Sequence, residues 1–235
     1  MKGLSVHRRA QKRGRIKIAD RLGCIRQLVA ALTFCPLASD AMPATLTPVS
    51  LRLTPEEYFA WEETQVERHE YINGEIFPIS GASRTHKVIA DNLHFFLRIA
   101  LAKTECRGFT EGLRVQVEAG GRYTYPDVTV VCGEEKYLDT KRQTLTNPTL
   151  VVEVLSESTK AYDRSEKLAS YRELFSIQEI VLIHQDRRAA EVYRREGAGR
   201  WSIEEVPADG ALELASVGAT VSMDDVYVET GVPGV

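Results

Sequence analysis

The stretch Pro148-Thr-Leu-Val-Val-Glu-Val-Leu155 decides the fold, because it is a continuous apolar run interrupted by one acid, Glu153. A run of this length and composition is typical of a buried strand. A second apolar run, Tyr125-Pro-Asp-Val-Thr-Val-Val131, carries Asp127 near its start. We expect the two runs to form neighbouring strands of one sheet.

The two acids in these strands carry the chemical information. A carboxylate is rarely placed in a buried strand unless it is paired or binds a cation. Side by side, Asp127 and Glu153 would present oxygen ligands to one hard metal such as Mg²⁺ or Mn²⁺. A divalent metal held in this way is suited to the hydrolysis of phosphodiester bonds. Taken alone, Asp127 is equally well explained as a turn or strand-entry residue after Pro126.

Helix and strand signals alternate along the rest of the chain. Thr54-Pro-Glu-Glu57 predicts a helix start with a capping box, and Asn73-Gly74 predicts a hairpin turn. Apolar residues at helical spacing predict a long helix over 83–103. The other expected elements are strands at 69–72, 75–79, 109–118, 179–184, 189–195 and 201–206, and a helix at 163–175. This order predicts an α/β sandwich with a central mixed β-sheet flanked by helices.

Charge divides the chain into parts of different character. Residues 1–41 carry nine Lys and Arg against two acids, whereas the remainder carries 21 Lys and Arg against 31 acids. We expect residues 1–50 to be a basic, disordered extension, 51–206 the folded domain, and 207–235 a C-terminal tail or edge elements. Three interpretations of the extension stay open: a nucleic-acid-binding arm, a secretory signal, or an unstructured segment translated from upstream of a start at Met42.

Composition excludes several classes of protein. The chain has 235 residues, of which 43% are hydrophobic and 27% charged, as in one soluble domain with an extension. No apolar run reaches the roughly 18 residues of a membrane helix, so no membrane partner is expected. The four cysteines (Cys24, Cys35, Cys106 and Cys132) form no Cys-x-x-Cys pair. We therefore expect no zinc site or disulfide framework, and a cytoplasmic location.

Five segments form a recognisable set in chain order. They are Tyr71-Ile-Asn-Gly-Glu-Ile76, His86, Tyr125-Pro-Asp-Val128, Leu150-Val-Val-Glu-Val-Leu-Ser156 and Asp163-x-x-x-Lys167-x-x-x-Tyr171. The set resembles the Uma-two family, which is placed in the PD-(D/E)XK nuclease superfamily, and the resemblance covers about residues 51–206. It implies a restriction-endonuclease-like sandwich fold, a Mg²⁺- or Mn²⁺-dependent endonuclease activity and DNA as the substrate.

The resemblance also implies a role for individual residues. Asp127 and Glu153 match the two metal-binding acids of the superfamily pattern. The pattern has a catalytic lysine two residues after the second acid, where this chain has Leu155. Lys167 is expected to replace it, because an ammonium on the following helix can reach back to the end of the Glu153 strand.

Other residues complete the expected site. Tyr171 is expected to support Lys167, because residues four apart share one face of a helix. His86, near the start of the long helix, is expected to contact a phosphate or a bound water. For the third metal ligand we expect Glu75, with Glu70 as the second choice.

Two other functions stay open. A catalytically inactive nuclease-fold protein that binds nucleic acid or a protein partner is favoured by Leu155 and by the acidic composition after residue 41, which binds phosphates poorly. A glycosidase that uses Asp127 and Glu153 would need an aromatic-lined groove, for which an aromatic content of 8% offers sparse material. The apolar strands and helix stripe are compatible with a homodimer.

Overall fold

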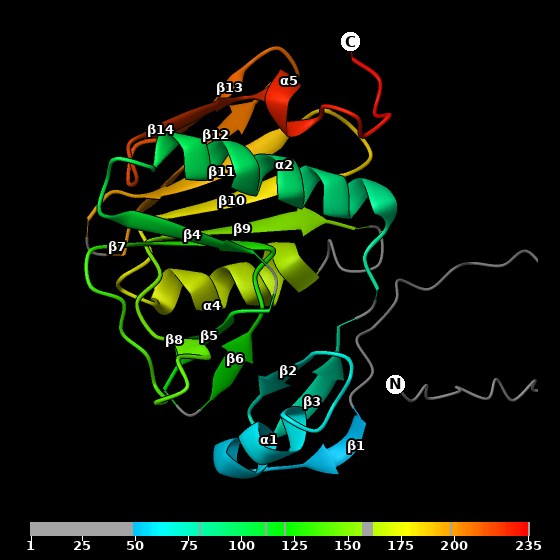
Figure 1. Ribbon diagram of the computed structural model, residues 1–235, viewed down its shortest axis with the longest axis vertical. Coiled ribbons are helices and arrows are strands. Elements are labelled where there is room, and N and C mark those ends of the chain that lie inside the picture. The colour runs from blue at the N-terminus through cyan, green and yellow to red at the C-terminus, as the bar shows by residue number, and fades with distance from the viewer. Residues whose placement is uncertain are drawn as a thin grey trace, which may run out of the picture. The chain divides into compact units, whose positions relative to one another are not determined.

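The central sheet of the protein is mixed, as predicted. The structure, a computed structural model, describes residues 49–79, 81–110, 112–119, 121–156, 162–197 and 199–234. The central sheet has the strand order β12-β11-β10-β9-β7-β4 (Figure 1). Strands β9 and β10 are parallel, and the other neighbours are antiparallel. The bounds are β4 (Cys106–Thr110), β7 (Val128–Cys132), β9 (Leu150–Leu155), β10 (Glu179–His184), β11 (Ala190–Arg195) and β12 (Trp201–Val206).

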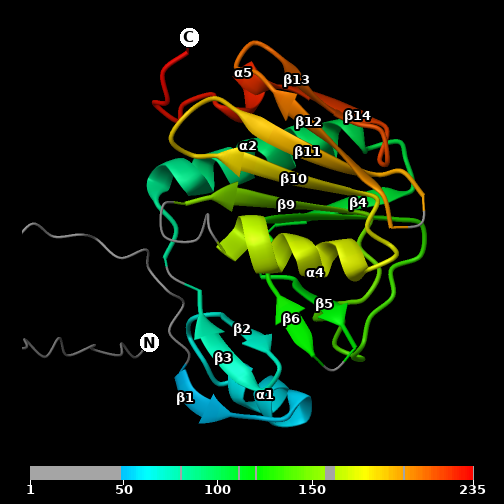
Figure 2. The same cartoon turned by 180° about the vertical axis from the view of Figure 1, so that it is seen from behind.

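The two acid-bearing segments are neighbours, because β7 pairs with β9 in the middle of this sheet. Successive residues of a strand face opposite sides of the sheet. Val152 and Val154 therefore pack in the core with helix α2 (Arg84–Ala100), whereas Val151 and Leu155 pack with helix α4 (Leu168–Glu173). The two helices cover opposite faces (Figure 2). Glu153 shares the α4 face of the strand.

A second sheet lies beyond α4 and has the order β1-β3-β2-β6-β5-β8. Its strands are β1 (Val49–Arg52), β2 (His69–Ile72), β3 (Glu75–Pro78), β5 (Arg114–Glu118), β6 (Arg122–Thr124) and β8 (Thr144–Leu145). Helix α1 (Pro55–Glu62) begins with the predicted capping box on Thr54. The predicted hairpin is also present, with positive φ angles of 50° at Asn73 and 95° at Gly74.

Three segments differ from the sequence predictions. The strand predicted at 109–118 is two strands, since Gly112 has a φ of 103°, which turns the chain out of the extended conformation. The strand predicted from Tyr125 begins only at Val128, because Pro126 has no N–H for a ladder hydrogen bond. The predicted helix at 163–175 begins as a π-helical turn, η1 (Asp163–Lys167), and continues as α4.

Beyond residue 206 the chain continues in β13 (Ala211–Leu214), β14 (Ala219–Ser222) and α5 (Met223–Val226). Leu212, Leu214 and Met223 are buried in the same core as α2. The C-terminal elements therefore extend the core that α2 shares with the central sheet. The predicted extension lies outside the described residues, except for positions 49 and 50.

The prediction that the cysteines stay unpaired is wrong for two of them. Cys106 and Cys132 form a disulfide, since they face each other across β4 and β7. Their separation of 26 residues hides this pairing in the sequence. Among the described residues, no helix is both long and apolar enough to cross a membrane.

Candidate active site

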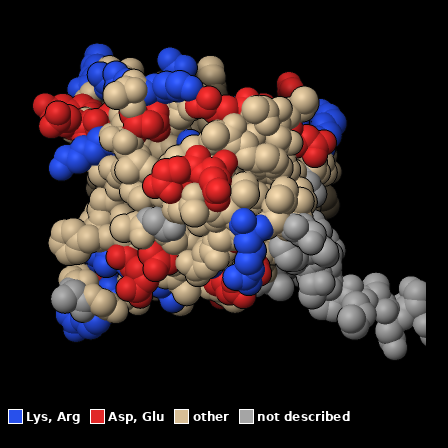
Figure 3. All heavy atoms as spheres, turned by 90° about the horizontal axis from the view of Figure 1, so that it is seen from below, with Lys and Arg blue, Asp and Glu red and all other residues tan. Residues whose placement is uncertain are grey.

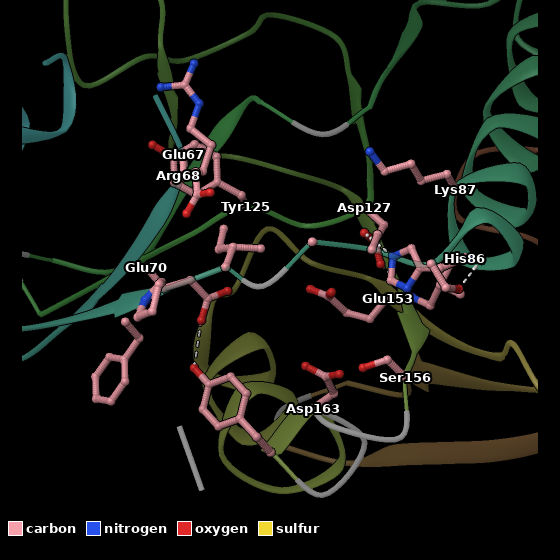
Figure 4. A pocket seen from close by; sticks show the side chains of 18 of the residues that line it. Glu67, Arg68, Glu70, His86, Lys87, Tyr125, Asp127, Glu153, Ser156 and Asp163 are labelled. Atoms are coloured by element: carbon pink, nitrogen blue, oxygen red, sulfur yellow. Dashed lines mark hydrogen bonds and ion pairs between the residues drawn. The ribbon is translucent and has the colours of Figure 1, made fainter. Parts of the chain in front are cut away.

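A cavity of about 710 Å³ brings together most of the predicted site residues. It is lined by β2 and the end of β3, the start of α2, the residues before β7, the end of β9, and η1. Its acidic lining residues are Glu67, Glu70, Asp127, Glu153 and Asp163 (Figure 4). Segments separated by about 100 residues thus meet at the α4 side of the central sheet.

Both carboxylate oxygens of Asp127 have a hydrogen-bond partner. The Val154 N–H of strand β9 donates to Oδ2 over 2.7 Å, and Nε2 of His86 lies 2.9 Å from Oδ1. His86 is held in the first turn of α2, where its backbone N–H donates to the N-cap Ser83. His86, which we expected to contact phosphate or water, therefore contacts the predicted metal ligand and fixes its orientation.

Glu153 is buried, with 4% of its surface exposed. Its Oε1 accepts a hydrogen bond from the Tyr171 hydroxyl at 2.6 Å and lies 2.9 Å from Nζ of Lys167. Burial raises the pKa of the Glu153 carboxyl well above its ordinary value, and the opposing effect of Lys167 is smaller. The neighbouring carboxylates of Asp127 and Asp163 raise this pKa further. Burial thus makes the ionised form of Glu153 less favourable than that of an exposed glutamate.

Lys167 lies among three carboxylates, although its side chain is only 7% exposed. Its Nζ is 2.9 Å from Glu153, 3.0 Å from Glu70 and 3.8 Å from Asp163. Burial lowers the pKa of Lys167, but the carboxylates, Glu153 first and Glu70 next, raise it well above its ordinary value. The ammonium thus stays charged and lies where the sequence predicted a replacement for the lysine missing at position 155.

Leu155 itself belongs to the apolar cluster under α4. Tyr171, which comes from the same helix as Lys167, hydrogen-bonds both Glu153 and the hydroxyl of Thr124. The spacing of Asp163, Lys167 and Tyr171 therefore brings these side chains onto one buried face, as predicted.

The structure does not place Glu75 in the cavity. Glu75 pairs with the exposed Arg52 at 2.8 Å and lies beside the hairpin turn. The second choice, Glu70, is there instead: it is buried, contacts Lys167, and accepts a hydrogen bond from the Tyr162 hydroxyl at 3.0 Å. The prediction that Glu75 lies with the other site residues was wrong, because the sequence does not show which end of the hairpin faces the cavity.

Tyr162 was missed altogether. Its hydroxyl holds Glu70, and its position directly before Asp163 was the only sequence signal for it. Burial raises the pKa of Tyr162 far above that of an exposed tyrosine, and the nearby Glu70 adds to this effect. Tyr162 therefore remains a neutral hydrogen-bond donor to Glu70.

Three carboxylates, from Glu70, Glu153 and Asp163, thus share Lys167, and a fourth, from Asp127, lines the same cavity. Such a surplus of negative charge favours a further cation, and carboxylate oxygens are the donors that Mg²⁺ and Mn²⁺ prefer. Within the described ranges, no three His, Cys, Asp or Glu side chains are grouped so as to hold an ion by themselves. Mg²⁺ is commonly bound by one or two carboxylates, with waters and substrate phosphates completing its shell. The donor set fits that mode of binding.

Comparisons with known proteins identify a family and two relatives of this chain. The model of the Uma2 family, described as "Putative restriction endonuclease", matches residues 55–224. Two proteins of Synechocystis sp. that are described as uncharacterized are 37% and 35% identical over 176 and 159 residues. The alignments cover 75% and 68% of this chain, and 92% and 90% of the relatives.

A solved structure gives the fold. The crystal structure of "a putative nuclease belonging to DUF820" from Anabaena variabilis superposes with a TM-score of 0.62 at 20% identity. The match covers 74% of this chain and 97% of that one. The fold is the restriction-endonuclease-like sandwich that the sequence predicted.

Proposed function

The chain belongs to the Uma2 family, and from this premise we propose that it is a metal-dependent endonuclease that hydrolyses phosphodiester bonds in DNA. Membership of a family of this description and the nuclease fold support a nuclease function. The observation that carries the proposal is the position of Lys167, 2.9 Å from Glu153 at the floor of the cavity. The chain thereby has both a carboxylate pair and a cation, although position 155 is a leucine.

Asp127 and Glu153 would hold Mg²⁺ or Mn²⁺ at the floor of this cavity. When bound, such an ion acidifies water and neutralises charge on the scissile phosphate. His86 and the Val154 N–H keep the Asp127 carboxylate in one orientation. Because the pKa of Glu153 is raised, protonation of this carboxyl competes with binding of the ion.

Lys167 acts on the charge that develops during hydrolysis. Water oxygen forms a bond to phosphorus and loses a proton, one ester P–O bond breaks, and the leaving oxygen takes up a proton. The ammonium of Lys167, held by Glu70 and Glu153, orients the attacking water and stabilises the negative charge on the phosphoryl oxygens. A cation that is already held in place needs little reorganisation to do this.

A second candidate is a nuclease-fold protein that binds nucleic acid without cutting it. Two observations favour it: Leu155 stands in the lysine position, and Lys167 is engaged by carboxylates in the structure. The two candidates make the same prediction for binding and opposite predictions for cleavage.

The test is cleavage of supercoiled plasmid DNA with Mg²⁺ or Mn²⁺ and with EDTA. We expect the wild type to nick plasmid only with metal, and Asp127→Asn to be inactive. Asp91→Asn is the matched control, since Asp91 is an exposed residue of α2 that does not line the cavity. Equal cleavage by Asp127→Asn and wild type would refute the site. DNA binding without cleavage by the wild type would favour the second candidate.

A further inference from the structure

We propose that Arg68 and Lys87 form a phosphate-binding pair that holds a polynucleotide backbone on the two sides of the scissile bond. The inference rests on the proposed nuclease function and names the part of the substrate that the cavity rim recognises. It requires a polyanion with phosphates flanking the reacting one, and therefore an internal position in a chain and not an isolated phosphomonoester.

The cations that line the cavity fall into two kinds. Three lining residues are lysine or arginine: Arg68, Lys87 and Lys167. Lys167 is buried and held by carboxylates, whereas Arg68 and Lys87 are exposed. Neither of these two makes an ion pair with any acid in the part of the chain that the structure describes. They are the cavity cations that remain available to an anionic ligand.

Each of these cations is close in the sequence to a residue of the proposed active site. Arg68 directly precedes β2, two residues before Glu70, and its guanidinium lies 5.8 Å from the centre of the Tyr125 ring. Lys87 follows His86, which contacts Asp127. Figure 4 shows Arg68 and Lys87 on opposite sides of the cavity. A backbone that runs from one to the other crosses the cavity that the carboxylates line.

The start of α2 is also arranged for an anion. Its first turn has no acidic residue and carries Arg84, His86 and Lys87. Cations are electrostatically unfavourable at a helix N-terminus, where the backbone N–H groups already make a positive end. The first turn of α1 shows the usual arrangement, with Glu56 and Glu57. Basic residues in this turn of α2 lower helix stability slightly and raise the local attraction for phosphate.

The charge of the whole domain makes such local cations necessary. The residues after position 41 carry ten more acids than Lys and Arg. On the face shown in Figure 3, Lys and Arg alternate with Asp and Glu, and no continuous basic area forms. Affinity for a phosphate backbone comes from cations that neutralise individual phosphates, and beside the proposed active site Arg68 and Lys87 are the exposed cations that can do so.

One exposed acid that lines the cavity opposes this attraction, so removing its charge should change DNA affinity in the opposite direction from removing a cation. Glu67 is exposed, lines the cavity and directly precedes Arg68. A carboxylate there repels a phosphate that Arg68 would bind. Removing its charge should therefore strengthen binding, whereas removing the charge of Arg68 or Lys87 should weaken it.

The experiment measures binding and not cleavage, so that it is independent of the proposed chemistry. Fluorescence anisotropy of a labelled 20-base-pair DNA duplex is followed in EDTA from 50 to 300 mM NaCl, with the full chain. The variants are Arg68→Gln, Lys87→Gln and Glu67→Gln. The matched controls are Arg200→Gln and Lys136→Gln, since both residues are exposed and neither lines the cavity.

We expect Arg68→Gln and Lys87→Gln each to weaken binding by roughly tenfold at 0.1 M salt and to lower the salt slope by about 1. Glu67→Gln should bind more tightly, and the controls should bind as the wild type does. Equal losses of DNA affinity in the control variants, or unchanged binding in Arg68→Gln and Lys87→Gln, would contradict the proposal that Arg68 and Lys87 form a phosphate-binding pair. If the wild type still cuts plasmid in that case, the proposed function survives; a wild type that neither binds nor cuts contradicts both.

Discussion

Two buried glutamates on adjacent strands of the central sheet differ in how their charge is balanced. Glu179 on β10 and Glu153 on β9 are 2% and 4% exposed. Glu179 has a complete set of partners: Arg194 donates to Oε1 at 2.9 Å, and the N–H and hydroxyl of Ser216 donate to Oε2. Around Glu153 one lysine serves several carboxylates.

The comparison shows that burial of an acid in an apolar strand does not by itself indicate a functional site. Both segments carry an acid beside a run of branched apolar residues, and the sequence alone does not separate them. What separates them is the surroundings: Glu179 belongs to a closed ion-pair network, whereas Glu153 opens onto a cavity with a surplus of negative charge. We therefore expect Glu179 to contribute to stability and Glu153 to take part in cation-dependent chemistry.

The largest expected effect is the loss of cleavage in Glu153→Gln. The substitution keeps the shape of the side chain and removes a charged metal ligand, so we expect the rate of plasmid nicking to fall by roughly 10³-fold or more. Glu179→Gln is the control, and it should cut at close to the wild-type rate at temperatures where it is folded. Equal activity losses in the two variants would remove the distinction between the glutamates.

The next effect concerns Lys167. Lys167→Met keeps an unbranched side chain of similar helix propensity and removes the ammonium. We expect the single-turnover cleavage rate to fall by roughly 10²–10³, the scale for deleting one electrostatic stabiliser. Mn²⁺ should still bind, which calorimetry would check. Undiminished cleavage would mean that another group stabilises the developing charge.

Stability should respond in the opposite way. Glu179→Gln leaves Arg194 and Ser216 with a weaker partner, and we expect the free energy of unfolding to fall by about 1–3 kcal/mol. Arg194 also contacts Glu204, which limits the loss. Glu153→Gln should be as stable as the wild type or more stable at neutral pH, because burial disfavours the ionised carboxylate of Glu153 and Lys167 keeps Glu70 and Asp163 as partners. Urea unfolding in EDTA measures both, and a less stable Glu153→Gln would contradict the assignment.

A smaller effect follows from pH. Because the folded pKa of Glu153 lies well above its ordinary value, the folded wild type holds a proton that the unfolded chain has lost at pH values between the unfolded and folded pKa. The wild type should thus lose stability relative to Glu153→Gln as pH rises from 5 toward the folded pKa, by at most about 1.4 kcal/mol per pH unit. Lys167, whose pKa is raised, does not titrate in this window. Thermal midpoints from pH 5 to 9 in EDTA would test this, and parallel curves for the two proteins would contradict it.

The sequence predicted the helices, strands and turns more accurately than the contacts between distant segments. The apolar runs, the Thr54 capping box and the Asn73-Gly74 turn are local signals, and the corresponding elements are present. The position of Lys167 beside Glu153 could be expected from the family resemblance, because an ammonium on the following helix can reach back to the end of the Glu153 strand. Glu70 could not be separated from Glu75, because strand β2 is buried at three successive residues and shows no alternation.

The pairing of distant segments was the main limit. The Cys106–Cys132 disulfide depends on which strands become neighbours, and no spacing in the sequence indicates it. The same holds for the contact between His86 and Asp127, which are 41 residues apart. The roles assigned to Asp127, Glu153 and Lys167, the metal, and a homodimer stay predictions.

The most direct test of the central claim is isothermal titration of Mn²⁺ into wild type, Glu153→Gln and Glu179→Gln at the same pH. The surplus of carboxylates around Lys167 predicts binding by the wild type, with an affinity that rises with pH as Glu153 releases its proton. Glu179→Gln should bind in the same way, and Glu153→Gln should show no binding heat. Mn²⁺ binding to Glu153→Gln with wild-type affinity would contradict the account.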